Sequence, residues 1–264
     1  MKKQLKGNHI GIIVFLTIGI LGLLFILPPM PQDLHYHNFA DHTTFMGIPN
    51  FMNVISNFPF IVIGIIGLFR INKITIKEFP KTALLFFFIG VILTGLGSAY
   101  YHWQPDNDSL IWDRIPMTIT FMSLFAAILS LHIDYRIGKN LLYPFLLAGI
   151  LSVVYWFGSE LKGQGDLRPY IFVQFYPMLM IPLVMFLFPV KGTLYKLLLP
   201  MIGFYAVAKY FEYGDHDFYS LGYLLSGHTL KHLFAALATA AVLNIEKFYQ
   251  LNLTINTYGK STIK

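Results

Sequence analysis

The feature that most constrains this chain is a series of long apolar stretches, each long enough to cross a membrane as a helix. A spanning helix needs about 20 mainly apolar residues, because the bilayer core offers no water to bond the backbone. Charged residues make up only 12% of the chain, whereas soluble domains contain roughly 25%. We therefore predict an all-α integral membrane protein. The candidate stretches are residues 10–28, 49–69, 82–102, 114–132, 141–158, 170–189, 193–212 and 221–244.

The first stretch is predicted to be an uncleaved helix rather than a signal peptide. Its apolar run from Ile10 to Leu27 is longer than the roughly 7–15 residues of a secretory core, and prolines follow it where a cleavage site needs small residues. No internal repeat or appended soluble domain is found in the rest of the sequence.

The positions of the basic residues predict the orientation. With the N-terminus in the cytoplasm, most lysines and arginines fall in cytoplasmic segments, as the positive-inside rule requires. The net charge of +6 then reflects topology, and nucleic acid is not expected as a partner. Both termini are predicted to be cytoplasmic. The basic residues assigned to that side are Lys2, Lys3, Lys6, Arg70, Lys73, Lys77, Lys81, Arg136, Lys139, Lys191, Lys196, Lys247, Lys260 and Lys264.

Three histidines are predicted to meet in the outer half of the bilayer. His228 and His232 are four residues apart, which places both imidazoles on one helix face, and His102 ends the third stretch at a similar depth. Ionisable groups at this depth are costly unless they pair or bind a metal. Three imidazoles form the ligand set of a catalytic zinc with an open fourth position. The alternative is histidines that hydrogen-bond between helices.

Ser98 and Asp113 are predicted to lie beside these histidines. Ser98 is one turn before His102, and Asp113 is at the outer start of the fourth stretch. A hydroxyl there can donate to the oxyanion of an acyl-transfer intermediate. A carboxylate can move protons or orient an imidazole. The alternatives are a serine bonded to a helix carbonyl and an aspartate in the first turn of a helix.

Four further charged residues, Lys209, Glu212, Asp215 and Lys231, are candidates for a network around the histidines. Lys209 and Glu212 are three residues apart and can pair on one helix face. Lys231 lies between the paired histidines and needs an acidic partner, which Glu212 or Asp215 can supply. Such a network would support His228. The alternative is that Lys209 and Glu212 extend to the aqueous interface.

Several other polar residues are expected to be solvated in loops. The loop histidines have irregular spacing, so a second zinc site is not expected there. The residues in this class are His35, His37, His42, Asp106, Asp108, Glu160, Lys162, Asp166 and Arg168.

Four motifs share their spacing and order with one membrane family. They are Asn50-Phe-Met-Asn53-Val-Ile-Ser56-Asn57, Ser98-x-x-x-His102, Asp113-x-x-Pro116-Met117 and His228-x-x-x-His232. This set resembles the alkaline ceramidase family, part of a superfamily of seven-helix membrane hydrolases and receptors. The resemblance implies a seven-helix bundle over residues 38–245, preceded by an extra transmembrane helix within 1–37 and followed by a cytoplasmic tail, 246–264.

The resemblance also implies a reaction and a ligand set. Zn²⁺ is assigned to His102, His228 and His232, with Ser98 and Asp113 as catalytic partners in cleaving the amide of ceramide or a related N-acyl lipid. The products are a fatty acid and an amine such as a sphingoid base. The distribution of basic residues predicts that this site faces the outer side of the membrane.

One departure from the family concerns calcium. Some eukaryotic members bind calcium through an acidic cluster before the first core helix, where this chain offers Asp41, Asn50 and Asn53. Calcium sites generally use several carboxylates, so calcium is not expected.

Two other functions stay open. One is a lipid-binding protein resembling the progestin and adiponectin receptors, with a structural zinc and little turnover. The other is a bis-histidine haem protein.

Overall fold

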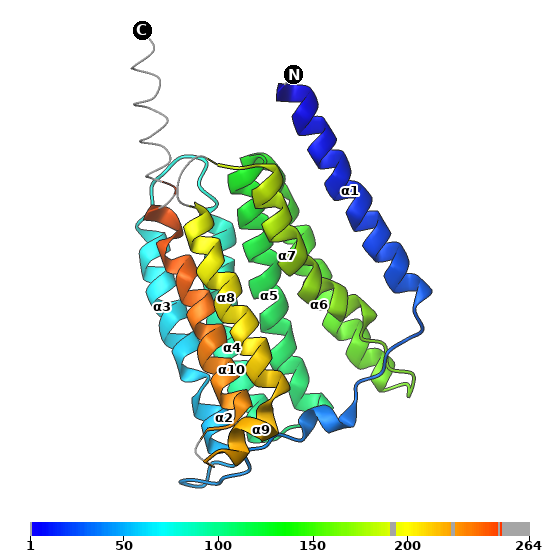
Figure 1. The fold of residues 1–264 in the computed structure, drawn as a ribbon, viewed down its shortest axis with the longest axis vertical. Helices are drawn as coiled ribbons and strands as arrows, with labels where there is room; N and C mark the ends of the chain where they lie inside the picture. The colour runs from blue at the N-terminus through cyan, green and yellow to red at the C-terminus, as the bar shows by residue number, and fades with distance from the viewer. Residues whose placement is uncertain (1, 191–193, 223–224, 248, 250–264) are drawn as a thin grey trace. The chain divides into compact units, whose positions relative to one another are not determined.

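The computed structural model describes residues 2–190, 194–222, 225–247 and 249. Within these ranges the chain is helical, no strand forms, and one isolated bridge joins Phe45 to Ile48 (Figure 1). The all-α prediction is confirmed. The helices are α1 Lys2–Ile26, α2 Phe51–Ile55, α3 Phe58–Asn72, α4 Lys81–Trp103, α5 Asn107–His132, α6 Tyr135–Glu160, α7 Arg168–Leu187, α8 Leu194–Tyr213, α9 Asp215–Ser220 and α10 Gly227–Ala241, with 3-10 turns η1 Leu34–His37 and η2 Val242–Asn244.

Several helices in the described ranges are long and apolar enough to cross a membrane. These six segments are Gly7–Ile26, Phe51–Asn72, Lys81–Trp103, Asn107–His132, Tyr135–Glu160 and Arg168–Leu187. The chain is thus a membrane protein by the length and composition of its helices. Because α8 and α10 are not among the six, the count of seven helices plus one stays a prediction. Lys191, Lys260, Lys264 and most of the predicted tail 246–264 lie outside the described residues.

Helix α5 begins at Asn107, seven residues before the predicted start, because Asp106 and Ser109 cap it. The Ser109 amide donates to Asp106 Oδ1 at 2.6 Å, and the Asp106 amide donates to Ser109 Oγ at 3.1 Å. This reciprocal pair satisfies two amide donors at the helix start. Asp106 is therefore a partly exposed capping residue, whereas the sequence suggested only a solvated loop residue. Asp113 lies inside α5, which contradicts the alternative that placed it in a first helical turn.

Other helix boundaries also differ from the prediction, and two of these differences have a local cause in the sequence. The stretch 49–69 is interrupted after Ile55, and α3 restarts at Phe58 with Pro59 in its first turn, where a proline costs no hydrogen bond. The last helix begins at Gly227 instead of residue 221, because Ser226 caps it by accepting from the Thr229 amide at 3.0 Å.

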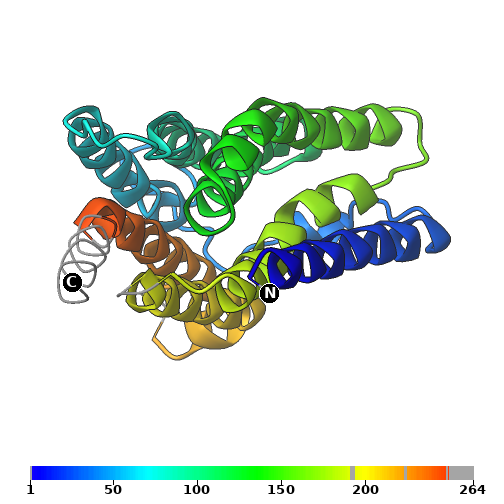
Figure 2. The same ribbon diagram turned by 90° about the horizontal axis from the view of Figure 1, so that it is seen from above.

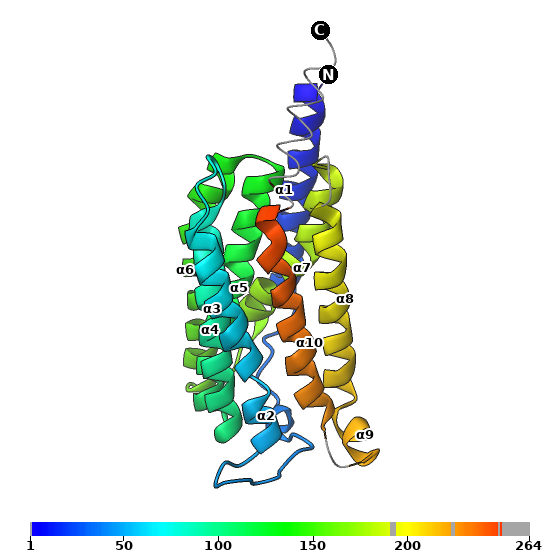
Figure 3. The same cartoon turned by 90° about the vertical axis from the view of Figure 1, so that its left-hand side faces the viewer.

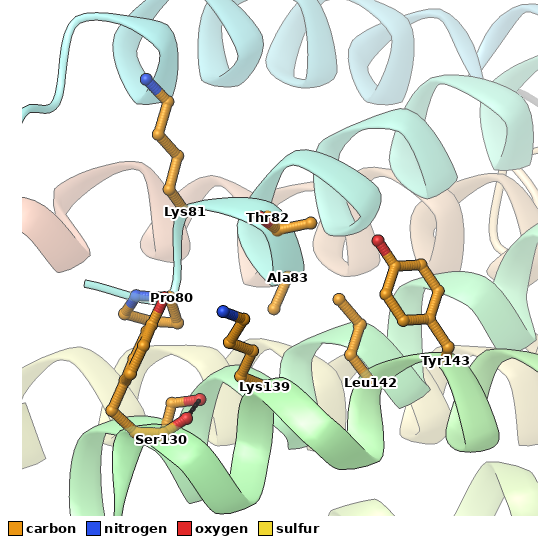
Figure 4. A pocket seen from close by; sticks show the side chains of 9 residues that line it. Pro80, Lys81, Thr82, Ala83, Ser130, Lys139, Leu142 and Tyr143 are labelled. Carbon is orange, nitrogen blue, oxygen red and sulfur yellow. Dashed lines mark hydrogen bonds between the residues drawn. The ribbon is translucent and has the colours of Figure 1, made fainter. Parts of the chain in front are cut away.

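The chain divides into two compact units, which we describe separately. The first contains residues 2–33, 76–87 and 117–189. In it α1 packs against α7 (Figure 2). The hydroxyls of Thr17 and Tyr176 are 2.6 Å apart. A pocket lies where Lys139 and Leu142 of α6 point toward the start of α4 (Figure 4). None of the residues that line this pocket is a predicted site residue.

The acidic side chains at the loop between α6 and α7 in this unit are less solvated than expected, whereas Lys162 is exposed as expected. Glu160 Oε1 accepts from the Gln32 amide at 2.6 Å and from Trp156 Nε1 at 2.9 Å. Asp166 is buried, and its carboxylate pairs with Arg168 at 2.8 Å. Hydrogen bonds from Arg168 hold the pKa of the Asp166 carboxyl below its usual range. Sequence reasoning could not show that the loop folds onto the segment after α1.

The second unit contains residues 34–75 and 88–116 and the described residues from 190 onward. Here α10 packs along α8 and also contacts α3 (Figures 1 and 3). A Cβ atom at Gly227 would collide with the Phe211 carbonyl, so the close approach of α10 to the end of α8 requires glycine. All of the predicted site residues lie in this unit.

Candidate metal centre

Three buried imidazoles converge in the second unit. His102 comes from the end of α4, and His228 and His232 come from successive turns of α10. The ring centroids are 4.7–4.8 Å apart, and one ligand atom of each ring lies within 4.8 Å of the others. Within the described part of the chain, this is the one group of His, Cys, Asp or Glu that could hold a metal ion.

The donor atoms fit a tetrahedral metal site. The Nε2 atoms of His102 and His228 are 3.1 Å apart. Two nitrogens bound to one tetrahedral ion at about 2.0–2.1 Å would be separated by about 3.3 Å. A hydrogen bond between these two rings would also give this distance, but it leaves the third ring unexplained. A metal ion held by the three rings would account for the convergence of all of them.

His232 is held by polar residues at the junction of α2 and α3. Ser56 Oγ lies 2.8 Å from His232 Nδ1 and 3.1 Å from the Asn53 carbonyl. The amide oxygen of Asn53 accepts from the hydroxyls of Ser226 and Thr229 at 3.1 and 2.9 Å. Sequence reasoning did not assign a role to Ser56. The available signal was a cluster of polar residues within an otherwise apolar stretch.

His228 is held through its backbone. Its amide donates to Asp215 Oδ1 at 2.7 Å, and the Ala40 amide donates to Asp215 Oδ2 at 2.9 Å. The Phe39 ring lies over two of the imidazoles, with centroids 4.3 Å from His228 and 4.6 Å from His102. Asp215 thus contacts the ligand helix directly, whereas the sequence suggested it as a partner of Lys231.

The surroundings of His102 include a loop histidine that was expected to be solvated. His37 Nδ1 lies 2.8 Å from the Tyr101 hydroxyl, and His37 Nε2 lies 3.0 Å from Asn107 Oδ1. The Asn50 side chain donates to the His102 carbonyl at 2.9 Å. His37 is therefore part of the packing around the site, while His35 and His42 are exposed.

The residues considered for calcium are individually buried. Asp41 Oδ1 accepts from the Thr43 amide at 2.9 Å, and its Oδ2 has no hydrogen-bond partner among the described residues. The side chains of Asn50 and Asn53 bond to the protein as given above.

Ser98 and Asp113 are brought together by close packing of α4 against α5. A Cβ atom at Gly97 would collide with the Trp112 carbonyl, so only glycine permits this approach. Both side chains are buried, and Ser98 hydrogen-bonds to the Asp113 carboxyl group. This bond differs from the serine-to-carbonyl bond considered as an alternative.

Glu212 joins the two lysines of the predicted network. Its Oε1 lies 2.6 Å from Lys231 Nζ, and its Oε2 pairs with Lys209. The pair with Lys231 links α8 to α10 beside His232. Lys231 also interacts electrostatically with Asp113 and with the three imidazoles. The structure therefore groups all four network candidates around the ligand helix.

Comparisons with known proteins give one result. A model of the ceramidase family matches residues 40–194, more than half of the chain. The matched region contains Ser98, His102 and Asp113, whereas His228 and His232 follow it. No curated protein and no solved structure matches the chain.

Proposed function

The chain belongs to the alkaline ceramidase family, and from this premise we propose that it is a zinc-dependent hydrolase of the amide bond in ceramide or a related N-acyl lipid. The products are a fatty acid and an amine such as a sphingoid base. The observation that supports this proposal most is the convergence of three buried imidazoles in the same compact unit as the Ser98–Asp113 pair.

The proposed ligands of the metal are His102, His228 and His232. Three neutral imidazoles without a sulfur ligand suit zinc, and a set of three protein ligands would leave a fourth position for water or substrate. When bound, zinc lowers the pKa of a coordinated water to about 7 and polarises the carbonyl oxygen of the substrate.

Asp113 and Ser98 have complementary proposed roles. The Asp113 carboxylate accepts a proton from the attacking water and delivers it to the nitrogen of the amide as the carbon–nitrogen bond breaks. The Ser98 hydroxyl donates a hydrogen bond to the carbonyl oxygen as negative charge develops there. The hydrogen bond between the two residues orients both groups before the substrate binds.

The surrounding charges have proposed supporting roles. Asp215 fixes the first turn of α10 through the His228 amide. Glu212 joins Lys209 and Lys231, which keeps the charge of Lys231 paired beside the site. Unpaired charges at membrane depth are costly, so this pairing stabilises the ligand helix against α8.

The proposed site lies toward the outer side of the membrane, with both termini in the cytoplasm. The distribution of basic residues in the sequence supports this orientation. The acyl chains of a lipid substrate can then remain in apolar surroundings while its amide reaches the metal.

Hydrolysis of a fluorescent ceramide by the purified protein tests the proposal. We expect bound zinc, loss of activity with a chelator, recovery with added Zn²⁺, and a fall of more than about 1,000-fold in His232→Ala. Full activity in His232→Ala would contradict the proposal. Lipid binding without measurable turnover would indicate the receptor-like alternative instead.

A further inference from the structure

The junction of α2 and α3 contains polar side chains that the proposed reaction does not use. Asn53, Ser56 and Asn57 are 0%, 5% and 0% exposed, within a segment long and apolar enough to cross a membrane. Burying such groups in an apolar environment is unfavourable unless they are hydrogen-bonded. Their contacts therefore indicate what the junction does.

The His232 ring bonds to this junction through the Ser56 hydroxyl and also through the Asn53 backbone. The Ser56 hydroxyl oxygen is 2.8 Å from His232 Nδ1 and 3.1 Å from the Asn53 carbonyl. A carbonyl can only accept, so a Ser56 hydroxyl that donates to Asn53 accepts a hydrogen bond from Nδ1–H. A proton on Nδ1 leaves Nε2 with a free lone pair, which is the form of imidazole that binds a metal.

The same junction holds the first turn of α10. Asn53 Oδ1 accepts from Ser226, the N-cap residue of α10, and from Thr229 in its first turn. One short segment therefore fixes both the position of the ligand helix and the rotation of one of its imidazoles. His102 differs, because its Nδ1 atom has no hydrogen-bond partner among the residues that the structure describes.

From these contacts we infer that Ser56 is a positioning residue, which sets the ring orientation and the protonated nitrogen of His232. The inference rests on the proposed function, because it takes His232 to be a metal ligand. Partners of this kind on ligating histidines typically change metal affinity by about 10–100-fold when they are removed.

The experiment compares zinc affinity, measured by competition with a chelator, in the full-length protein and three variants. Ser56→Ala removes the hydroxyl, and Ser56→Thr keeps it. Ser152→Ala is the matched control, because Ser152 is also 5% exposed and donates to the carbonyl three residues before it, a bond that involves no imidazole. We expect about 10–100-fold weaker zinc binding in Ser56→Ala and wild-type affinity in the other two.

A second measurement does not depend on the variants being folded. In a structure of the zinc-loaded wild-type protein, we expect His232 to bind through Nε2 with Ser56 on Nδ1. Ligation through Nδ1, or wild-type affinity in Ser56→Ala, overturns the inference and leaves the proposed hydrolase intact. A wild-type protein that binds no zinc overturns both.

Discussion

Two clusters of buried charge, one in each compact unit, have similar contacts and different surroundings. Around Asp166 in the first unit, the partners are Arg168 and Tyr155, which are close in sequence and tie a loop together. Around Asp113 in the second unit, Lys231 and Ser98 come from other helices, and three imidazoles lie within the same group of interacting residues. Each cluster contains an ion pair, Asp166 with Arg168 in the first and Glu212 with Lys231 in the second. The second cluster differs from the first because it contains three imidazoles that could hold a metal ion.

Among variants in the two clusters, the largest loss of hydrolysis is expected when the charge of Asp113 is removed. Asp113→Asn keeps the shape of the side chain and loses its capacity to take a proton, so we expect hydrolysis to fall by about 10²–10⁴-fold. Zinc content should stay unchanged, because Asp113 is not a proposed ligand. Steady-state rates and metal analysis of the same preparation provide the measurement. Retained activity would assign Asp113 to the same structural class as Asp166.

A smaller loss is expected for Ser98→Ala. The variant removes one proposed donor to the carbonyl oxygen, and single donors of this type contribute about 10²-fold to the rate. The loss should appear in kcat, with little change in KM, because the interaction strengthens as charge develops. A change confined to KM would show that Ser98 only binds the substrate.

The smallest catalytic effect is expected for Asp166→Asn in the first unit. We predict unchanged hydrolysis and a loss of about 1 kcal/mol in stability, since hydrogen bonds to a charged carboxylate are lost. Melting temperature in detergent, measured against pH, provides the check. The pKa of Asp166 is lowered in the folded state. Its carboxylate therefore contributes to stability at pH values above the usual aspartate pKa of about 3.9.

The difference between wild type and Asp166→Asn should therefore shrink as the pH falls through the lowered pKa of the folded state. A difference that grows on acidification would contradict the assigned ion pair with Arg168. A loss of hydrolysis in Asp166→Asn would remove the distinction between the two clusters.

The sequence predicted the features that depend on local spacing. The pair His228 and His232 is separated by about one helical turn, so their common face followed from helix geometry. Their convergence with His102 followed from charge placement along the chain. The apolar stretches also predicted the helices, with errors where Asp106 and Ser226 cap helix starts that composition does not reveal.

The remaining contacts join residues far apart in the sequence, and no periodicity predicts them. Ser56 and His232 are separated by 176 positions, and Asp215 and Ala40 by 175. The contact made by Ser56 depends on the interruption between α2 and α3, which an apolar stretch of uniform composition conceals. A cluster of polar residues in a spanning segment is the feature that would have directed attention to Ser56.

The Asp215 carboxylate joins two segments that are far apart in the sequence. It holds the Ala40 amide with one oxygen and the His228 amide with the other, and Phe39, next to Ala40, lies on two imidazoles. One side chain therefore ties the segment that covers two of the rings to the first turn of α10. Loss of the Asp215 carboxylate would release both at once, so the cover over the imidazoles and the start of the ligand helix share a single anchor.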